Sequence, residues 1–372
     1  MSAFQHLASF PGYKSLHRVA KPFLFLLFVL AHIPGNLVHA GEYHVGVFYF
    51  PGWKDRQPHA PAPYPWARLK AFPERKPLLG WYDEGDDAVM RQQLDWMAQY
   101  RIDFVVFDWY YGAQRQVFLE HALAAYMRAP NRDKVKFSIL WANHDSMPKS
   151  KEDWLSMVRY WVKYYFPRPE FLTSGGKPVV FIFSADELKK KAEAFGSTSK
   201  DLLDSAQVLA KENGFPGIDF IAGAGAYVPM ISSYARDSGY AGFSAYNYHQ
   251  GPDDQRQSHS YDELDRGYRE HWQRFAEKAT LPLIVPMTSG WDKRPWGGSK
   301  DTEHDNSIPT PQEFKKHLEA ARQFMDVNPR LTKGMGVICC WNEFGEGSMI
   351  EPTESSGFSF LEQVKQVLGS RK

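Results

Sequence analysis

Eight short apolar segments alternate with helical patterns along the chain, and this order restricts the fold more than any other feature. The segments lie at 44–50, 102–110, 135–143, 177–184, 218–225, 240–248, 281–289 and 335–343. Strands that are separated by helices need crossover connections, which pair the strands in parallel. Eight such units in a chain of this length fit a closed barrel better than an open doubly wound sheet. We therefore predict an α/β fold, a single-domain (β/α)8 TIM barrel.

Start signals support the helices between these segments. Ser150 with Asp153 resembles a capping box ahead of an apolar periodic stretch. Thr310, Pro311 and Glu313 supply a cap, a first-turn proline and a third-position acid. Further helices are predicted at 87–100, 115–127, 200–213, 261–278 and 357–368. The connection over 51–86, rich in proline and aromatic residues, is interpreted as a loop over one end of the barrel.

The N-terminal segment has the composition of an export signal. Basic residues within 14–21 precede an apolar run at 23–33, which is shorter than the about 20 residues that a membrane-spanning helix needs. Val38-His39-Ala40 then offers a cleavage site of the small-x-small type. We predict a signal peptide over 1–40 and a catalytic barrel over 41–372. The protein would be secreted or periplasmic. The alternative is that this segment is not cleaved and anchors the protein to a membrane. If the segment is cleaved, no stable membrane insertion is expected.

The charge balance and the histidines exclude several classes of ligand. Lys and Arg number 44 against 43 Asp and Glu, a net charge of +1, which argues against a nucleic-acid partner. His144, His249, and His304 with Asp305 do not form a recognised spacing of metal ligands. The sequence therefore predicts no metal and no cofactor.

The only two cysteines, Cys339 and Cys340, are adjacent in the sequence. Successive side chains of a strand point to opposite faces, so we expect no ordinary disulfide between them. The fold would then depend on its apolar core alone, which a chain of this length can build.

Polar and aromatic residues gather where the predicted strands end, which is where TIM barrels place their active sites. Flat rings, amides and carboxyls suit a sugar, since they supply stacking faces and hydrogen-bond partners for hydroxyls. Asp108 is either a substrate ligand or a buried paired acid, and Trp109 either stacks on substrate or packs under a helix. The predicted substrate-binding residues are Tyr49, Asp108, Trp109, Tyr110, Asn143, Tyr246, Asn247, Trp291, Trp341 and Asn342.

Two carboxylates follow the last strand. Glu343 is predicted to end the strand on the same face as Trp341, and Glu346 lies past a turn that Gly345 and Gly347 permit through their backbone freedom. Glycoside hydrolysis uses a carboxyl pair on the two sides of the scissile bond. A Glu-x-x-Glu pair is usually a solvated pair of charges, but at a strand end beside Trp and Asn it indicates catalytic acid and base residues.

The segment "WNEFGEGSMIEP" at 341–352 resembles the "WNEW-x-EG" signature of glycoside hydrolase family 99, the endo-α-1,2-mannosidase and mannanase family, and of the wider WbsX-type proteins of polysaccharide gene clusters. "GVFYFPGW" at 46–53, the segment 80–112 and "SGWDKRP" at 289–295 are similar to the same wider group. The resemblance implies that Glu343 takes the proton of the substrate 2-hydroxyl and that Glu346 protonates the leaving oxygen. It also implies retention of configuration through a 1,2-anhydro sugar.

This resemblance favours one function over two alternatives. Phe344 and Gly345 stand where the mannosidases carry Trp and His, so the chemistry is predicted more firmly than the sugar. We expect a retaining glycoside hydrolase whose partner is an oligosaccharide or polysaccharide, an α-mannoside or a related α-linked glycan. The alternatives are a WbsX-type glycosyltransferase of polysaccharide biosynthesis and a non-catalytic glycan-binding barrel. A transferase would need a nucleotide-sugar site, and the sequence has no phosphate-binding glycine loop.

Overall fold

The structure is a computed structural model that describes residues 43–57, 63–112, 114–144 and 148–369. The predicted signal peptide and its cleavage site lie outside the described residues. Within the described ranges, none of the helices has the length and apolar character needed to cross a membrane.

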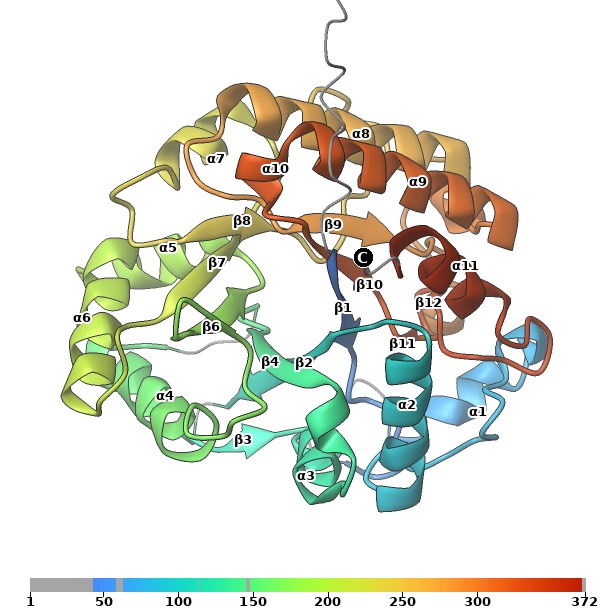
Figure 1. Cartoon of the computed structure of the whole chain (residues 1–372), viewed down its shortest axis with the longest axis horizontal. Coiled ribbons are helices and arrows are strands. Elements are labelled where there is room, and N and C mark those ends of the chain that lie inside the picture. Colours follow the sequence, from blue (N-terminus) through green and yellow to red (C-terminus); the bar gives the residue numbers. More distant parts are fainter. Residues whose placement is uncertain (1–42, 58–62, 113, 145–147, 370–372) are drawn as a thin grey trace, which may run out of the picture. The chain divides into compact units, whose positions relative to one another are not determined.

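Eight parallel strands form the barrel (Figure 1). Their order around the sheet is β8, β7, β6, β4, β2, β1, β10, β9, and a bridge between Phe243 and Leu283 connects the two ends of this path. Each of the eight predicted segments overlaps one of the strands, so the predicted barrel is confirmed. The strands are β1 (His44–Tyr49), β2 (Phe104–Tyr111), β4 (Lys136–Trp141), β6 (Lys177–Ile182), β7 (Asp219–Gly223), β8 (Gly242–Ser244), β9 (Val285–Thr288) and β10 (Met335–Cys339).

Helices cover the outside of the strands (Figure 1). The long ones are α2 (Asp87–Gln99), α3 (His121–Arg128), α4 (Lys151–Tyr164), α5 (Ala185–Ala194), α6 (Ser199–Glu212), α8 (Tyr261–Lys278), α9 (Pro311–Val327) and α11 (Ser359–Leu368), and the short ones are α1 (Pro65–Leu69), α7 (Val228–Ser233) and α10 (Pro329–Thr332). The predicted caps are present. The Ser150 side chain accepts a hydrogen bond from the Asp153 amide, and Thr310 and Glu313 form a complete capping box.

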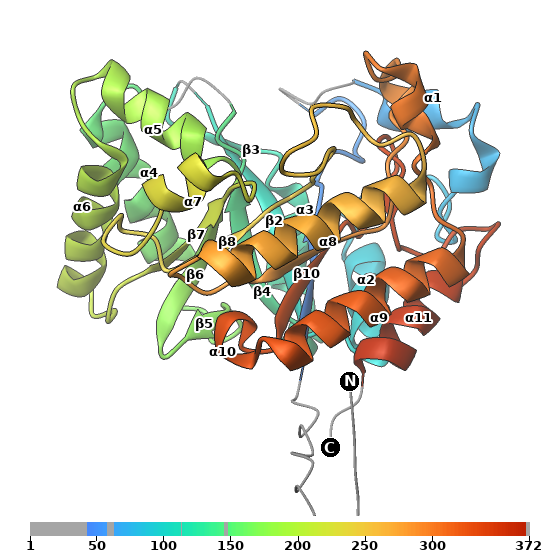
Figure 2. The same cartoon turned by 90° about the horizontal axis from the view of Figure 1, so that it is seen from above.

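Two parts of the prediction for the long helices need correction. The helix predicted at 115–127 begins only at His121, because Val117–Phe118 form strand β3, which pairs antiparallel with the end of β2. Helix α5 was not predicted; its N-cap Ser184 accepts a hydrogen bond from the Glu187 amide. The predicted loop over 51–86 contains α1 and a 3-10 turn at Pro73–Arg75. In Figure 2 the segment around α1 lies at one end of the barrel strands.

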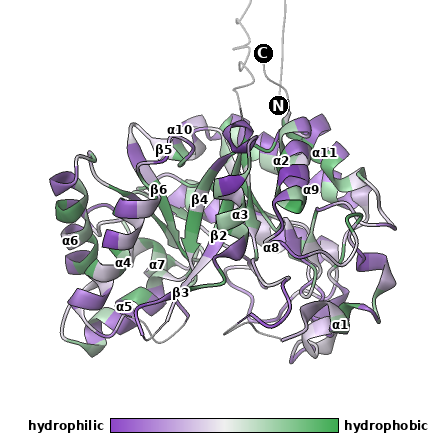
Figure 3. Cartoon of the chain, turned by 90° about the horizontal axis from the view of Figure 1, so that it is seen from below, coloured by the Kyte–Doolittle hydropathy of each residue, from purple (hydrophilic) through white to green (hydrophobic). Residues whose placement is uncertain are grey.

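The core has two layers, set by the alternation of side chains along each strand. In β2, Phe104 and Val106 point into the barrel, while Val105 and Phe107 pack beneath the helices. Figure 3 shows the apolar strands inside helices whose surfaces are mixed in hydropathy. Burial of one such side chain contributes about 1.5–3 kcal/mol, so the two layers supply the main stabilisation of the barrel.

The two cysteines form a disulfide with each other across their shared peptide bond, although no ordinary disulfide was expected between them. That expectation assumed an extended strand with trans peptide bonds. The Cys339-Cys340 peptide bond is cis, and the two Cα atoms lie 2.9 Å apart. Both side chains are buried in the inner layer with Val337. The Ser289 hydroxyl donates to the Cys339 carbonyl at 2.9 Å and accepts from the Cys340 amide at 3.2 Å.

Candidate active site

A cavity of about 830 Å³ lies at the carboxyl ends of the barrel strands. Strand β2 and the segments that follow β1, β4, β6, β7, β8, β9 and β10 all contribute to its wall. The predicted site residues that line this cavity are Asp108, Tyr110, Tyr246, Asn247, Trp291, Glu343 and Glu346. The structure therefore brings both catalytic candidates and half of the predicted polar and aromatic ligands into one space.

Three predicted aromatic ligands lie outside this wall, in the core layer between the strands and the helices. Trp109 is 2% exposed, and its indole donates to the Tyr165 hydroxyl at 2.9 Å beneath α4. The Tyr49 hydroxyl donates to Gln93 at 3.0 Å. Trp341 is fully buried in the same layer. These rings lie at or near strand ends in the sequence, but their side chains pack in the layer away from the barrel axis.

Two predicted amides bind backbone groups of neighbouring strand ends. Asn143 donates to the Ser184 carbonyl at 2.8 Å and accepts from the Ser184 amide at 2.9 Å. Asn342 makes the same pair of bonds with Phe50, accepting at 2.9 Å and donating at 3.0 Å. Neither amide lines the cavity wall. Both fix the positions of the loops that do.

A tight hairpin holds the two glutamates. Strand β11 (Asn342–Glu343) pairs antiparallel with β12 (Ser348–Met349), and the Glu346 amide donates to the Glu343 carbonyl at 3.1 Å. Gly347 has a positive φ of 70°, as the predicted turn requires. Gly345 serves for a different reason than predicted: its φ is not positive, and a Cβ there would lie 1.9 Å from the Trp296 indole nitrogen.

A buried ion pair supports this hairpin from behind. Arg75 is 2% exposed and pairs with the Asp292 carboxylate. The same guanidinium donates to the Phe344 carbonyl at 2.9 Å and to the Asp292 carbonyl at 3.0 Å. The Asp292 amide in turn donates to the Glu346 carbonyl at 2.6 Å. Arg75 therefore ties the loop after β9 to the loop that carries the glutamates.

The Tyr246 hydroxyl connects two acids in the cavity wall. It lies 3.0 Å from Glu343 Oε1 and 3.1 Å from Asp108 Oδ2. Burial raises the pKa of both carboxyls well above their usual range, and for Glu343 the negative charge of Glu346 adds to the rise. Asp108 Oδ1 is buried and has no hydrogen-bond partner among the described residues. One hydroxyl proton cannot serve two carboxylates, so this triad favours a proton on one of the acids.

Glu346 has a less extreme environment. Burial raises its pKa to about 7, and the positive charge of Lys293 opposes the rise. Lys293 also opposes the rise in the pKa of Glu343, which stays well above its usual value. The two glutamates interact directly, so their protons titrate as a property of the pair. Near neutral pH the pair retains a proton, which gives the site a carboxylic acid and a carboxylate side by side.

Residues 71–364 match the family model described as Glycosyltransferase WbsX. The chain belongs to this WbsX family. Two curated relatives from strains of Xanthomonas campestris pv. campestris, each described as uncharacterized protein WxcX, are 23% identical over 312 residues. That alignment covers 78% of this WbsX-family chain but 42% of each relative, so the chain spans less than half of their length.

Solved structures share the fold of this WbsX-family barrel. A glycoside hydrolase-like protein superposes with a TM-score of 0.64 and 14% identity, over 88% of this chain and 95% of that one. The family 99 endo-α-mannosidase of Bacteroides thetaiotaomicron, in complex with bis-tris-propane, gives a TM-score of 0.60 and 15% identity, over 88% and 97% of the two chains. The likeness to family 99 inferred from the motifs is therefore confirmed for the fold.

Several cavity residues are not among the predicted catalytic and substrate-binding residues. Lys293 lines the cavity, and its positive charge opposes the rise in the pKa of both glutamates. It lies two residues beyond Trp291 in the "SGWDKRP" segment. His249 and Trp296 also line the wall. The strand-end rule reaches His249, which follows β8, but a lysine in a loop usually marks a solvated surface. Within the described residues, no group of three or more His, Cys, Asp or Glu side chains is arranged to hold a metal ion.

Proposed function

We propose that this WbsX-family protein is a retaining glycoside hydrolase that acts on an α-linked oligosaccharide or polysaccharide outside the cytoplasm. The observation that carries the proposal is the buried pair Glu343 and Glu346 in the wall of the strand-end cavity. The cavity volume, about 830 Å³, lies within the range of about 300–1,000 Å³ that small-molecule sites occupy. Trp291 and Tyr246 add ring faces of the kind that pack against sugars.

The proposed reaction uses one acid and one base in two steps. In the first step, Glu343 accepts the proton of the 2-hydroxyl while that oxygen attacks C1 and forms a 1,2-anhydro sugar. Glu346 donates its proton to the departing glycosidic oxygen, so the C1–O bond breaks to give an alcohol. In the second step, Glu346 takes a proton from water, which attacks C1, and Glu343 returns its proton to O2. Two inversions at C1 produce net retention.

The assignment of Glu343 as the base requires that the proton held by the triad lies on Asp108, because burial and the charge of Glu346 raise the pKa of Glu343 as well. If Asp108 keeps the proton, it donates to the Tyr246 oxygen, and the Tyr246 hydroxyl then donates to an ionised Glu343. A neutral Asp108 also avoids leaving a charged oxygen buried without a hydrogen-bond partner, which is costly. The general acid Glu346 has a pKa of about 7, which is suited to proton donation near neutral pH.

The family description favours a second candidate, glycosyl transfer. Lys293 and Arg68 are basic residues in the cavity wall, and they offer charges that a sugar phosphate donor would need. The three acids in the same wall oppose such a dianionic ligand. Transfer and hydrolysis therefore differ in what the cavity admits: a neutral glycan for hydrolysis, and an anionic activated sugar for transfer.

The test is a screen of the purified protein against a panel of α-linked oligosaccharides, followed by NMR of the first anomer formed. We expect hydrolysis of at least one member, with the α-anomer of the released sugar appearing first. Nucleotide sugars are tested in parallel with the same glycans as acceptors. Release of nucleotide with growth of the glycan, and no hydrolysis, would replace the proposed function by transfer. First appearance of the β-anomer would contradict the two-step mechanism.

A further inference from the structure

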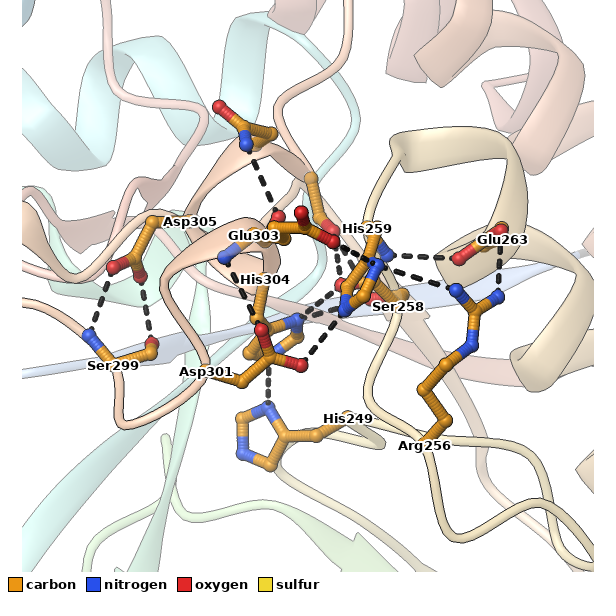
Figure 4. Close-up of polar contacts among 12 residues, drawn as sticks. His249, Arg256, Ser258, His259, Glu263, Ser299, Asp301, Glu303, His304 and Asp305 are labelled. Carbon is orange, nitrogen blue, oxygen red and sulfur yellow. Dashed lines mark hydrogen bonds and ion pairs between the residues drawn. The ribbon is translucent and has the colours of Figure 1, made fainter.

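Two histidines, His249 and His304 (Figure 4), meet edge to face beside Trp291, with their ring planes nearly perpendicular. His249 lines the cavity, and its Nδ1 lies 3.1 Å from Nε2 of the fully buried His304. His304 stacks on the Trp291 ring at 5.4 Å between centroids, and His249 meets that ring edge to face at 4.2 Å. Neither histidine takes part in the proposed reaction.

The hydrogen-bond partners of His304 determine where its proton lies. His304 Nδ1 is 2.8 Å from the Ser258 carbonyl oxygen, which can only accept. A lone pair on Nδ1 would face the lone pairs of that oxygen, so Nδ1 must carry the hydrogen. The Ser258 hydroxyl, 3.1 Å from the same nitrogen, is free to donate elsewhere, and Ser307 Oγ lies 3.0 Å away.

The tautomer of His304 in turn determines which ring nitrogen of His249 carries the hydrogen. Burial lowers the pKa of both histidines, that of His249 to about 3, with the charge of Lys293 adding to the effect there, so both rings are neutral near pH 7. A neutral His304 with its hydrogen on Nδ1 has a lone pair on Nε2, which must accept from His249. His249 therefore carries its hydrogen on Nδ1, and its Nε2 is left as a hydrogen-bond acceptor.

Further contacts hold the two loops in this arrangement. The Ser258 amide donates to the His249 carbonyl at 3.0 Å, which closes the loop from 249 to 258 on itself. His259, the next residue, lies between two acids of the opposite loop, 2.7 Å from Asp301 and 2.8 Å from Glu303 (Figure 4). On the other side of His304, Ser299 donates to Asp305 at 2.7 Å and accepts from the Trp291 indole at 3.0 Å.

We propose that the Ser258 carbonyl and His304 hold His249 as a fixed hydrogen-bond acceptor, whose Nε2 receives a hydroxyl of the glycan unit that packs against Trp291. This inference rests on the proposed function for the identity of the ligand. It makes His304 a positioning residue, because it acts on the glycan only through His249. An acceptor at this place selects units that present a hydroxyl or amide N–H and disfavours units that present a carboxylate there.

The proton positions can be measured without any substrate. In protein with ¹⁵N-labelled histidine, the nitrogen spectrum distinguishes a protonated ring nitrogen from one with a lone pair. His249→Gln and His304→Gln variants identify the two rings among the 13 histidines. We expect hydrogen on Nδ1 and a lone pair on Nε2 in both rings, unchanged between pH 7 and pH 5. A hydrogen on Nε2 of His249 would overturn the inference, whatever the protein hydrolyses.

The positioning role of His304 has its own readout. In His304→Gln protein the amide group can both donate and accept, so the hydrogen of His249 is no longer confined to Nδ1. We expect part of the His249 signal to change to the Nε2–H form. An unaltered His249 signal in a folded His304→Gln protein would assign His304 a packing role only.

The contact with the glycan is tested by kinetics on a panel oligosaccharide that the native protein hydrolyses. His249→Phe removes the acceptor and should raise KM about 10-fold with kcat little changed, the loss of one hydrogen bond. His249→Gln retains an acceptor oxygen and should recover part of this loss. An unchanged KM in His249→Phe would overturn the contact.

The contact between His249 and the glycan can be tested even if the proposed hydrolase function fails. If no panel member is hydrolysed, the hydrolase proposal fails, and the same oligosaccharides are titrated into labelled native protein. A shift of the His249 Nε2 signal at saturating glycan would then support the contact in a binding protein. No shift with any member would overturn it.

Discussion

Two groups of buried acids lie on opposite sides of the sheet, and they differ in what surrounds them. Glu343, Glu346 and Asp108 line the strand-end cavity. Glu351 lies outside the barrel beside α2, where Gln93 donates to one oxygen at 3.1 Å and Tyr82 to the other at 2.7 Å. Burial raises the pKa of Glu351 to about 8, as high as that expected of a catalytic acid.

The comparison shows that a raised pKa does not by itself identify a catalytic residue. Glu351 has a protein partner for each oxygen and does not line the cavity. Asp108 leaves one oxygen without a partner in the described residues, and Glu346 faces a space that a ligand can enter. Incomplete pairing in an accessible cavity, in addition to burial, distinguishes the candidate site.

The largest effect expected from this comparison is on activity. Glu343→Gln and Glu346→Gln should each reduce kcat/KM by about 10²–10⁴-fold, because each removes a proton-transfer group. Glu346→Gln should be partly spared with an activated aryl glycoside, whose leaving group needs little protonation, whereas Glu343→Gln should not. Glu351→Gln is the matched control and should keep native activity. A control variant as impaired as the other two would remove the distinction between the two groups.

Two tryptophans differ in the same way, since one lies in the core and the other lines the cavity. Trp109→Ala should lower the free energy of unfolding by about 3–5 kcal/mol, since this ring lies in the core layer. Trp291→Ala removes a ring that lines the cavity and should mainly weaken glycan binding. Chemical denaturation and binding titrations of both variants check this. Weaker binding in folded Trp109→Ala than in Trp291→Ala would reverse the assignment.

Glu351 should influence the pH dependence of stability. Its pKa in the folded protein, about 8, exceeds the value of 4.5 expected on unfolding, so the folded state holds the extra proton between these pH values. The contribution of this group is therefore full below pH 4.5 and is lost as pH rises through 8. Glu351→Gln, which mimics the protonated acid, should be more stable than native protein at pH 9 by on the order of 2 kcal/mol. Denaturation at pH 4.5 and pH 9 measures the difference, and an equal effect at both would contradict it.

A smaller effect is expected at Lys293. Its positive charge lowers the pKa of Glu346, so Lys293→Met should raise that pKa and move the alkaline limb of kcat/KM upward by about one pH unit. In the native protein this limb should lie near pH 7, where the general acid loses its proton. Arg68→Met, which removes another basic residue of the cavity wall, is the control. If the alkaline limb of kcat/KM lies at the same pH in Lys293→Met as in native protein, the proposed effect of Lys293 on the pKa of Glu346 is excluded.

Much of the fold follows from local patterns in the sequence. The apolar segments locate all eight barrel strands, and helix α8 occupies the predicted range, 261–278. The pairing of Cys339 with Cys340 could not be predicted, since it depends on a cis bond that no periodicity encodes. Strand β3 was missed because its residues become extended only by pairing with the end of β2.

The site was predicted less completely than the fold. Glu343 and Glu346 were predicted as the catalytic pair from their spacing, their place after a strand and the resemblance of their segment to family 99, and the structure puts both in the cavity wall. Trp109 and Tyr110 are neighbours in the sequence, but only Tyr110 lines the cavity, because alternate residues face opposite sides of the sheet. His304 is far from every strand end, and its link to the cavity through His249 depends on how two loops pack.

The most direct test of the central claim compares two glycosides that differ only at the 2-position of the sugar cleaved. The proposed mechanism uses the 2-hydroxyl oxygen as the nucleophile, so the native protein should hydrolyse the parent glycoside and leave the 2-deoxy analogue essentially uncleaved. The loss should appear in kcat, and the analogue should still bind, as competition with the parent glycoside would show. Cleavage of the 2-deoxy analogue at a normal rate, with retention of configuration, would contradict the account.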